Sequence, residues 1–247
     1  MRYFIDLAYD GTHYHGWQIQ NNVVTVQRVL NEALSTILRT EISTIGSGRT
    51  DTGVHAMMQV VHFDYANEIV VGQLAAKLNS LLPQDIAVRT IKPVKEGVSA
   101  RFEAVSRAYI YKIHQYKNPF LQGQSYQFHQ AIDLDQMNAC CELIKTWKDF
   151  EAMSKVKTEV NNFNCEIFDA YWKKHNGEIH FHVSANRFLR GMVRALVGTM
   201  LDVGQGRMTV EAFQAVLESR DRKKAGRSVP AHGLYLRDII YPKDIYL

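Results

Sequence analysis

The chain has 247 residues, of which 46% are hydrophobic and 22% are charged, and its formal net charge at pH 7 is +4. These values are typical of a globular protein with a sizeable core, and they exclude a histone-like polycation. No apolar run is long enough to span a membrane, and the first residues lack the apolar stretch of a signal peptide. The three cysteines show no C-x-x-C spacing, which indicates free thiols and a cytoplasmic location rather than disulfides or structural zinc.

Strands and helices are expected to alternate through the first half of the chain. Residues 2–9 alternate between apolar and polar positions, as a half-buried strand does. Thr25 can cap a helix whose apolar positions between Val26 and Leu38 form a helical stripe. The remaining expected elements are a strand near 42–45, a strand near 58–65, a helix near 71–81 and a strand near 86–93.

The second half of the chain repeats this alternation. The expected elements are a strand at 107–115, a helix at 134–147, strands at 165–173 and 178–184, helices at 187–203 and 210–217, and a strand at 235–241. We therefore expect an α+β fold of two related halves, each a mainly antiparallel β-sheet with helices on one face, with a cleft between them. The expected division is an N-terminal half, 1–101, and a C-terminal half, 102–247.

The segment from Gly46 to Ala56, GSGRTDTGVHA, places one carboxylate, Asp51, between an Arg-Thr pair and a glycine. Glycine lets the backbone turn sharply and approach a ligand closely. Arg49 can pair with a phosphate or keep the acid ionised. The pattern indicates a carboxylate that acts chemically near an anionic partner, and the alternative is a glycine-rich turn with a solvated Asp.

Known loop motifs fit this segment poorly. A P-loop ends in Gly-Lys-Ser or Gly-Lys-Thr, and no lysine follows these glycines. In a dinucleotide fingerprint the third glycine would come sooner than Gly53 does. The triplet Asp51-Thr52-Gly53 also occurs in aspartic proteases, which need two carboxylates. Since the chain has one such triplet, a protease would have to be a symmetric dimer.

The expected helix that begins at Arg187 would carry three arginines on one face. At about 100° per residue, Arg187, Arg190 and Arg194 share this face with Gly191 and Gly198. Each glycine costs a helix about 1 kcal/mol relative to alanine. The glycines therefore favour a face that something approaches closely over a merely solvated one.

Three further patterns leave alternatives open. Tyr109 and Tyr111 share a face of an expected strand, where they would either stack on RNA bases or pack in a core. The run RDRKKAGR, residues 220–227, either contacts phosphates or is a solvated loop. His180 and His182 share a strand face but have no third ligand at a matching spacing, so we expect no metal site.

Five segments, taken in order, give the chain a resemblance to the tRNA pseudouridine synthase A family over almost its whole length. Their number, order and spacing make the resemblance specific. The segments are AYDGTHYHGWQIQ (8–20), GSGRTDTGVHA (46–56), SARFEAVSRAYIY (99–111), NRFLRGMVRALVGTMLDVG (186–204) and AHGLYL (231–236).

The resemblance implies an isomerase that converts uridine to pseudouridine in the anticodon stem-loop of tRNA, at positions 38–40, without a cofactor. It also implies a homodimer with the RNA lying across both subunits. Three residues fall on catalytic residues of the family: Asp51 on the nucleophile, Tyr109 on the tyrosine that stacks on the target base and can take part in proton transfer, and Arg194 on the arginine that pairs with the aspartate and positions it. Leu234 falls on an apolar residue of the base pocket. Arg49 falls on a residue that helps to displace the target base.

The chemistry of this isomerisation agrees with the residues. The N1–C1′ bond breaks, the base rotates and a C5–C1′ bond forms, so no redox agent is needed. A carboxylate can act at C1′, at C6 or by taking a proton from C2′, and the sequence leaves these three open. Arg187 and Arg190 are candidates for binding the RNA, because phosphate contacts can offset the cost of unstacking the base. The alternative function is a non-catalytic RNA-binding protein.

Overall fold

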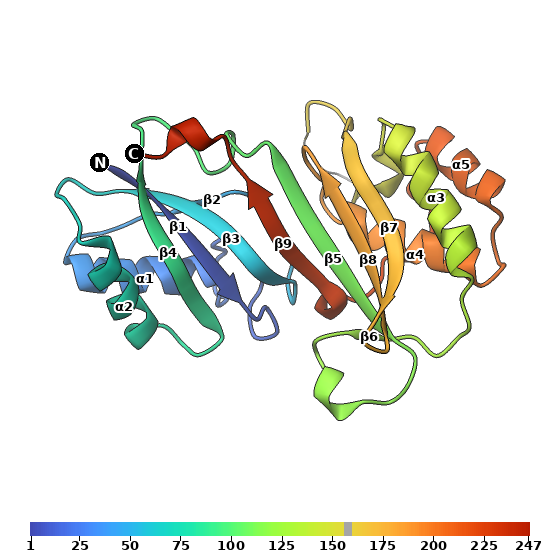
Figure 1. The fold of residues 1–247 in the computed structure, drawn as a ribbon, viewed down its shortest axis with the longest axis horizontal. Coiled ribbons are helices and arrows are strands. Elements are labelled where there is room, and N and C mark those ends of the chain that lie inside the picture. The colour runs from blue at the N-terminus through green and yellow to red at the C-terminus, as the bar shows by residue number, and fades with distance from the viewer. Residues whose placement is uncertain (156–159) are drawn as a thin grey trace. The chain divides into compact units, whose positions relative to one another are not determined.

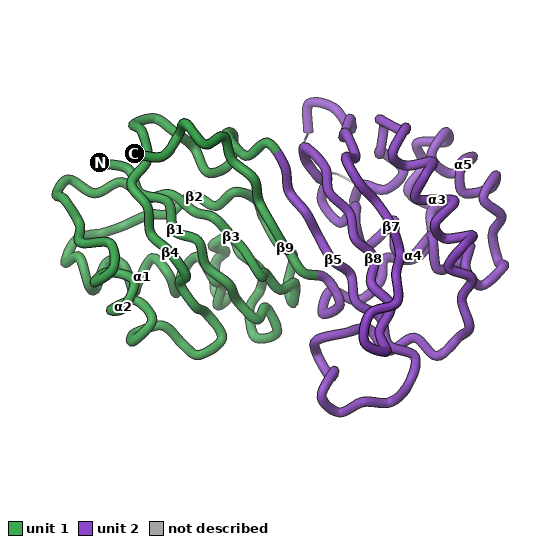
Figure 2. The backbone as a smooth tube through the Cα atoms, in the orientation of Figure 1, with its two compact units in different colours: residues 1–105, 235–247 green, residues 106–234 purple. Residues whose placement is uncertain are grey.

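The structure is a computed structural model that describes residues 1–155 and 160–247. The described chain divides into two compact units, unit 1 with residues 1–105 and 235–247, and unit 2 with residues 106–234 (Figure 2). The last strand is expected in the C-terminal half, but from Tyr235 onward it belongs to unit 1. There, Tyr235 and Leu236 pair in parallel with His55 and Ala56.

Unit 1 contains a sheet with the strand order β4-β1-β3-β9, and β2 pairs with β3 (Figure 1). Neighbouring strands are antiparallel except for β3 and β9, which are parallel. Helix α1 packs on α2, and α2 packs on β4. The elements are β1 (Arg2–Tyr9), α1 (Val26–Leu38), β2 (Ile45–Gly46), β3 (His55–Asp64), α2 (Val71–Leu81), β4 (Ile86–Val94), β9 (Leu234–Ile240) and the 3₁₀ helix η4 (Lys243–Ile245).

Local sequence explains the start of unit 1. In β1 the alternating residues Tyr3, Ile5 and Leu7 are almost fully buried, as the period of two predicts. Helix α1 begins after Thr25, whose hydroxyl accepts a hydrogen bond from the Arg28 backbone N–H at 3.4 Å. The N-cap expected at Thr25 is thereby confirmed.

Unit 2 contains a sheet with the strand order β5-β8-β7, all antiparallel, and β6 pairs in parallel with β5. Helix α3 packs on β7 and on α4, and α5 packs on α3 and α4. The elements are β5 (Ser106–His114), η1 (Pro119–Leu121), β6 (Tyr126–Gln127), α3 (Leu134–Thr146), η2 (Glu151–Met153), β7 (Ile167–His175), β8 (Glu178–Ala185), α4 (Met192–Gly204), α5 (Val210–Glu218) and η3 (Ala231–Gly233).

The α+β class with mainly antiparallel sheets is confirmed in both units. Helix α2 has the expected bounds, whereas β2 lies at Ile45–Gly46 instead of 42–45. The expected helix at 187–203 is wrong at its start, because α4 begins only at Met192. Strand β6 was not expected. No helix in the described part of the chain is long and apolar enough to cross a membrane.

The prediction of free thiols is confirmed. Cys140, Cys141 and Cys165 are buried and form no disulfide. Burial raises the pKa of Cys140 to about 12 and that of Cys165 to about 11. These thiols therefore stay protonated near neutral pH and behave as small core residues.

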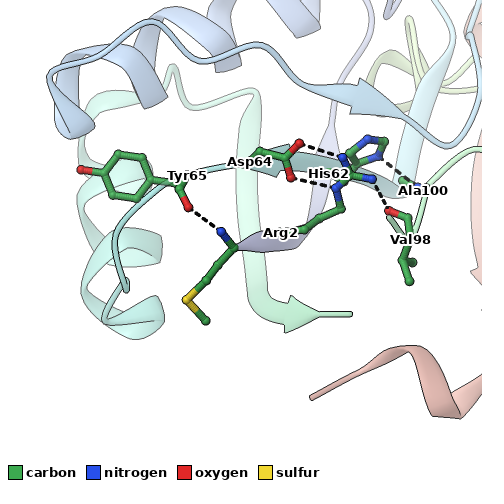
Figure 3. A network of polar contacts seen from close by, with 7 residues as sticks. Arg2, His62, Asp64, Tyr65, Val98 and Ala100 are labelled. Atoms are coloured by element: carbon green, nitrogen blue, oxygen red, sulfur yellow. Dashed lines mark hydrogen bonds and ion pairs between the residues drawn. The ribbon is translucent and has the colours of Figure 1, made fainter. Parts of the chain in front are cut away.

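Polar contacts of Arg2 connect the start of the chain to Asp64 at the end of β3, and His62 of the same strand binds Ala100 (Figure 3). The Arg2 guanidinium donates two hydrogen bonds to Asp64, at 2.8 and 2.7 Å, and one to the Val98 carbonyl. His62 Nδ1 accepts a hydrogen bond from the Ala100 backbone N–H at 3.0 Å. Because Nδ1 accepts, the imidazole is neutral. Burial, together with the charge of Arg2, lowers the pKa of His62.

We expect this buried histidine to make stability depend on pH. The pKa of His62 is lower in the folded protein, so the unfolded chain binds the proton first. The contribution of neutral His62 to the stability of the fold is fully present above the usual histidine pKa of about 6.5, and it is lost as the pH falls below that pKa. Urea unfolding between about pH 8 and pH 5 should give a smaller loss of stability in His62→Gln than in the wild type, since an amide oxygen can accept from Ala100 without titrating.

His13→Gln is the control, because His13 is exposed. It should retain the pH dependence of the wild type, to which the buried His114 and His180 also contribute through their lowered pKa values. An equal pH dependence in His62→Gln and the wild type would contradict the prediction.

Candidate active site

Asp51 lies on the loop between β2 and β3 of unit 1 and is partly exposed. Its neighbour Thr50 is buried, and the Thr50 hydroxyl shares a 2.8 Å hydrogen bond with the hydroxyl of Tyr9. On the other side, the buried Val54 donates its backbone N–H to the Asp51 carbonyl at 3.1 Å. The carboxylate is therefore carried by a loop that is anchored on both sides of it.

The chain around Gly16 packs directly against this loop. Gly16 has φ +82°, and a Cβ built there would lie 2.3 Å from the Thr50 carbonyl oxygen. The Trp17 N–H donates to that same oxygen at 3.3 Å, and the Gly53 N–H donates to the Tyr14 carbonyl at 3.3 Å. Two segments of the family resemblance, 8–20 and 46–56, thus form one packed structure. Gly11 and Gly16 of the first segment lie directly against the backbone of Val54 and Thr50 in the second.

The first part of the loop is held by a buried side chain of β3. Gln59 is fully buried, and its amide oxygen accepts a 2.5 Å hydrogen bond from the Ser47 hydroxyl. The amide nitrogen of Gln59 donates to the Gly48 carbonyl at 3.0 Å. Arg49 follows directly and is exposed. The arginine therefore extends from a backbone that is fixed beneath it.

The three arginines expected on one helix face do not share a helix in unit 2. Helix α4 begins at Met192, and Gly191 before it is left-handed, with φ +73°. Arg187 and Arg190 precede the helix, and the Arg190 carbonyl accepts from the Lys155 N–H at 2.9 Å. The apolar spacing continues through these residues, but the left-handed residue breaks the helix between Arg190 and Arg194.

The space left by Gly198 is occupied by the protein itself. A Cβ built at Gly198 would lie 1.9 Å from the Arg227 carbonyl oxygen, so any side chain there would displace backbone. The neighbouring Thr199 hydroxyl accepts from the Gly226 N–H at 3.0 Å. The close approach that we expected for a ligand is therefore made by the last residues of the basic run.

Arg194 is hydrogen-bonded to Val229, two residues after Arg227. Its Nε donates to the Val229 carbonyl at 2.7 Å, and the Val229 N–H donates to the Arg194 carbonyl at 3.2 Å. The next carbonyl, that of Pro230, accepts from the Tyr111 hydroxyl at 2.8 Å. Leu234, 6% exposed, lies four residues further on and opens β9. We refer to residues 229–234 as the arginine-binding segment.

Tyr109 and Tyr111 have different surroundings. Tyr109 is partly exposed, and its ring contacts Phe188 edge-on with the centroids 5.0 Å apart. Tyr111 is fully buried, so the core alternative holds for this residue. No local pattern around Tyr111 indicates that its hydroxyl binds a carbonyl 119 positions away.

The basic run is partly used for internal contacts. Arg222 donates to the carbonyls of Ala225 and Gly226 and to the Ser228 hydroxyl. Arg220 Nε lies 2.9 Å from an Asp149 carboxylate oxygen. The remaining bases of the run, Lys223, Lys224 and Arg227, are exposed. Their exposure is compatible with both alternatives for the run, phosphate contacts and a solvated loop, whereas Arg220 and Arg222 make contacts within the protein.

A metal centre finds no support in residues 1–155 and 160–247. No group of three or more His, Cys, Asp or Glu side chains there is arranged to hold a metal ion. His180 and His182 lie with their ring centroids 6.0 Å apart, and His180 Nε2 lies 3.3 Å from a Glu178 carboxylate oxygen.

The sequence profile of a family described as tRNA pseudouridine synthase matches residues 7–103 and 147–242. The chain belongs to the tRNA pseudouridine synthase family. It is 47% identical to a tRNA pseudouridine synthase A of Bacteroides thetaiotaomicron, over 99% of this chain and 92% of the relative. A synthase of the same name from Porphyromonas gingivalis is 43% identical over 100% of this chain and 99% of the relative, and one from Exiguobacterium sibiricum is 37% identical over 98% of each.

The tRNA pseudouridine synthase profile includes the Asp51 loop and, in unit 2, Arg194 and Leu234. Tyr109 lies between the two matched ranges, although the relatives above span nearly the whole chain. The second matched range also covers the segment 152–167, of which residues 156–159 lie outside the described residues.

Gly16→Ala should test the packing of the Asp51 loop. An alanine at this left-handed position costs about 1–2 kcal/mol before any clash, and its Cβ would also displace the Thr50 carbonyl. We expect urea unfolding to show a loss of at least this size, together with lower activity, since Thr50 precedes Asp51. Gly48→Ala, in the same region but with nothing within 4 Å of the added Cβ, should stay within about 0.5 kcal/mol of the wild type. Equal stabilities for the two variants would contradict the role given to Gly16.

Proposed function

We propose that this protein converts uridine to pseudouridine in the anticodon stem-loop of tRNA, at positions 38–40, with Asp51 as the nucleophile and without a cofactor. Membership of the tRNA pseudouridine synthase family supports the reaction class. The observation that carries the assignment of Asp51 is its partial exposure on a loop whose neighbours Thr50 and Val54 are buried and hydrogen-bonded. A nucleophile needs this combination of access and fixed position.

The proposed reaction is balanced within the substrate. Asp51 bonds to C1′ or to C6, the N1–C1′ bond breaks, and the base rotates. The C5–C1′ bond then forms, the bond to Asp51 breaks and returns its electron pair to the carboxylate, C5 loses its proton and N1 gains one. No electrons leave or enter the nucleoside, so no oxidant or reductant takes part. The protein has to supply a nucleophile, a route for protons and a site that holds the detached base.

Further residues take the roles that the resemblance implies. Arg194 takes the role of the family's arginine that pairs with the catalytic aspartate. Tyr109, with its partly exposed ring, stacks on the target base, and Leu234 provides an apolar wall. Arg49 helps to displace the base from its stack, which costs a few kcal/mol.

Binding to the RNA backbone is proposed for arginines that the structure leaves at least partly exposed, Arg187 and Arg190. Contacts between basic side chains and phosphates offset the cost of exposing a base. We also infer that the protein acts in the cytoplasm as a homodimer, with the RNA lying across both subunits. Light scattering of the purified protein, with and without tRNA, measures its oligomeric state.

The proposal predicts pseudouridine in an unmodified tRNA transcript incubated with the purified protein, and none with Asp51→Asn. Asparagine keeps the shape of the side chain and removes the nucleophilic charge. The product should map to positions 38–40, and a transcript with cytidines at those positions should stay unmodified. Asp64→Asn is the matched control, since Asp64 pairs with Arg2 on the surface of unit 1, and it should retain activity.

The other outcomes are equally informative. Pseudouridine outside the anticodon arm would overturn the proposed target and keep the reaction. tRNA binding of equal strength in the wild type and Asp51→Asn, with no product from either, would replace the proposal with a non-catalytic RNA-binding protein. Product from Asp51→Asn at the wild-type rate would remove Asp51 from the nucleophile's role.

A further inference from the structure

Two consecutive carbonyls of the arginine-binding segment are held by two different side chains of unit 2. The Val229 carbonyl accepts from Arg194 Nε at 2.7 Å, and the Pro230 carbonyl accepts from the Tyr111 hydroxyl at 2.8 Å. One peptide unit therefore separates the two acceptors. A displacement of Pro230 moves the Val229 carbonyl, because the peptide between them is planar and stiff.

Tyr111 also contacts the segment through its ring. A Cβ built at Gly233 would lie 2.7 Å from Cζ and 2.9 Å from Cε1 of Tyr111, so the ring occupies the place of the missing side chain. The hydroxyl thus holds the beginning of the segment and the ring borders its end, next to Leu234. The tyrosine itself is immobilised by complete burial in β5, where it pairs with Phe181 of β8.

The phenol of Tyr111 is a neutral donor. Burial raises its pKa well above the ordinary tyrosine value, and the nearby negative charge that Tyr126 would carry acts in the same direction. The positive charge of Arg194 acts in the opposite direction, which reflects the closeness of the two side chains. A neutral hydroxyl can hold the Pro230 carbonyl without offering Arg194 a competing carboxylate.

We propose that Tyr111 is a positioning residue for uridine isomerisation: by holding the Pro230 carbonyl and bordering Gly233, it sets the place of the Arg194 guanidinium and of Leu234. The inference rests on the proposed function for its readout. It assigns Tyr111 a task different from that of Tyr109 on the same strand face. Tyr109 contacts the base, whereas Tyr111 acts through the arginine-binding segment.

The first test is Tyr111→Phe, which removes the hydroxyl and keeps the ring. Loss of one buried hydrogen bond should lower kcat about tenfold, because the guanidinium loses its fixed place. KM for tRNA should change by less than about twofold, since tRNA binding depends mainly on phosphate contacts. An unchanged kcat would overturn the proposal.

The matched control is Tyr241→Phe. Tyr241 is also buried and also donates its hydroxyl to a backbone carbonyl, that of Ala100 in unit 1. It should lose thermal stability to a similar extent while kcat stays at the wild-type value. An equal fall of kcat in both variants would show that Tyr111 acts only through overall stability, and would overturn the proposal.

A double-mutant cycle tests the connection to Arg194. If Tyr111 acts through the arginine, its hydroxyl has little left to position in Arg194→Lys. The double variant should then turn over within about twofold of Arg194→Lys alone in single-turnover reactions. A further tenfold loss in the double variant would mean independent roles and would overturn the proposal.

Gly233→Ala disturbs the same contact from the opposite side. The added Cβ would overlap the Tyr111 ring and approach the Lys112 carbonyl to 2.9 Å, so the segment has to shift. We expect a fall in kcat with little change in KM, and a wild-type kcat would contradict the role of the ring.

Activity of the wild type separates the two proposals. No pseudouridine from wild-type protein refutes the proposed function, whereas an active wild type with an equally active Tyr111→Phe refutes only the positioning role.

Discussion

The place of Asp51 depends on one steric constraint, the passage of the backbone at Gly16 against the carbonyl of Thr50. A Cβ would lie 2.3 Å from that oxygen, so the contact exists only between two backbones. Unit 2 has a comparable contact where Gly198 meets the Arg227 carbonyl. In each unit, backbone contacts carry the packing beside a candidate catalytic side chain. Asp51 and Arg194 can therefore remain partly exposed while their surroundings are buried.

Local patterns were sufficient for most of the regular elements, and they singled out the Asp51 loop. The alternation in β1 and the stripe of α1 each reflect burial of a single face, which a short stretch of sequence encodes by itself. The loop was recognisable because its glycines and charged residues are adjacent in the chain. The same reasoning interpreted the glycines of this loop and of the arginine face as room for a ligand. An added Cβ would meet nothing within 4 Å at Gly48, whereas the room at Gly198 is taken by the backbone of Arg227.

Contacts between distant segments were beyond the reach of the sequence. The parallel pairing of β9 with β3 joins residues that lie 180 positions apart, His55 with Tyr235, and leaves no local signal. The start of α4 was misjudged because the apolar spacing continues through Leu189, and only the left-handed backbone at Gly191 ends it. Tyr111 was placed on a strand face correctly, but its partner is a carbonyl in another part of the chain. Side chains that act through such partners are found only in a structure.

The choice of a phenol at Tyr111 has an electrostatic reason. The Val229 and Pro230 carbonyls need donors, and a lysine or arginine at position 111 would place a second positive charge beside Arg194, raising the energy of both. An aspartate or glutamate would attract the guanidinium and compete with any other carboxylate for it. A buried tyrosine avoids both costs, since burial raises its pKa and keeps it neutral. It donates one hydrogen bond and fills the place that a side chain at Gly233 would occupy. Because the phenol is neutral, it adds no charge beside Arg194.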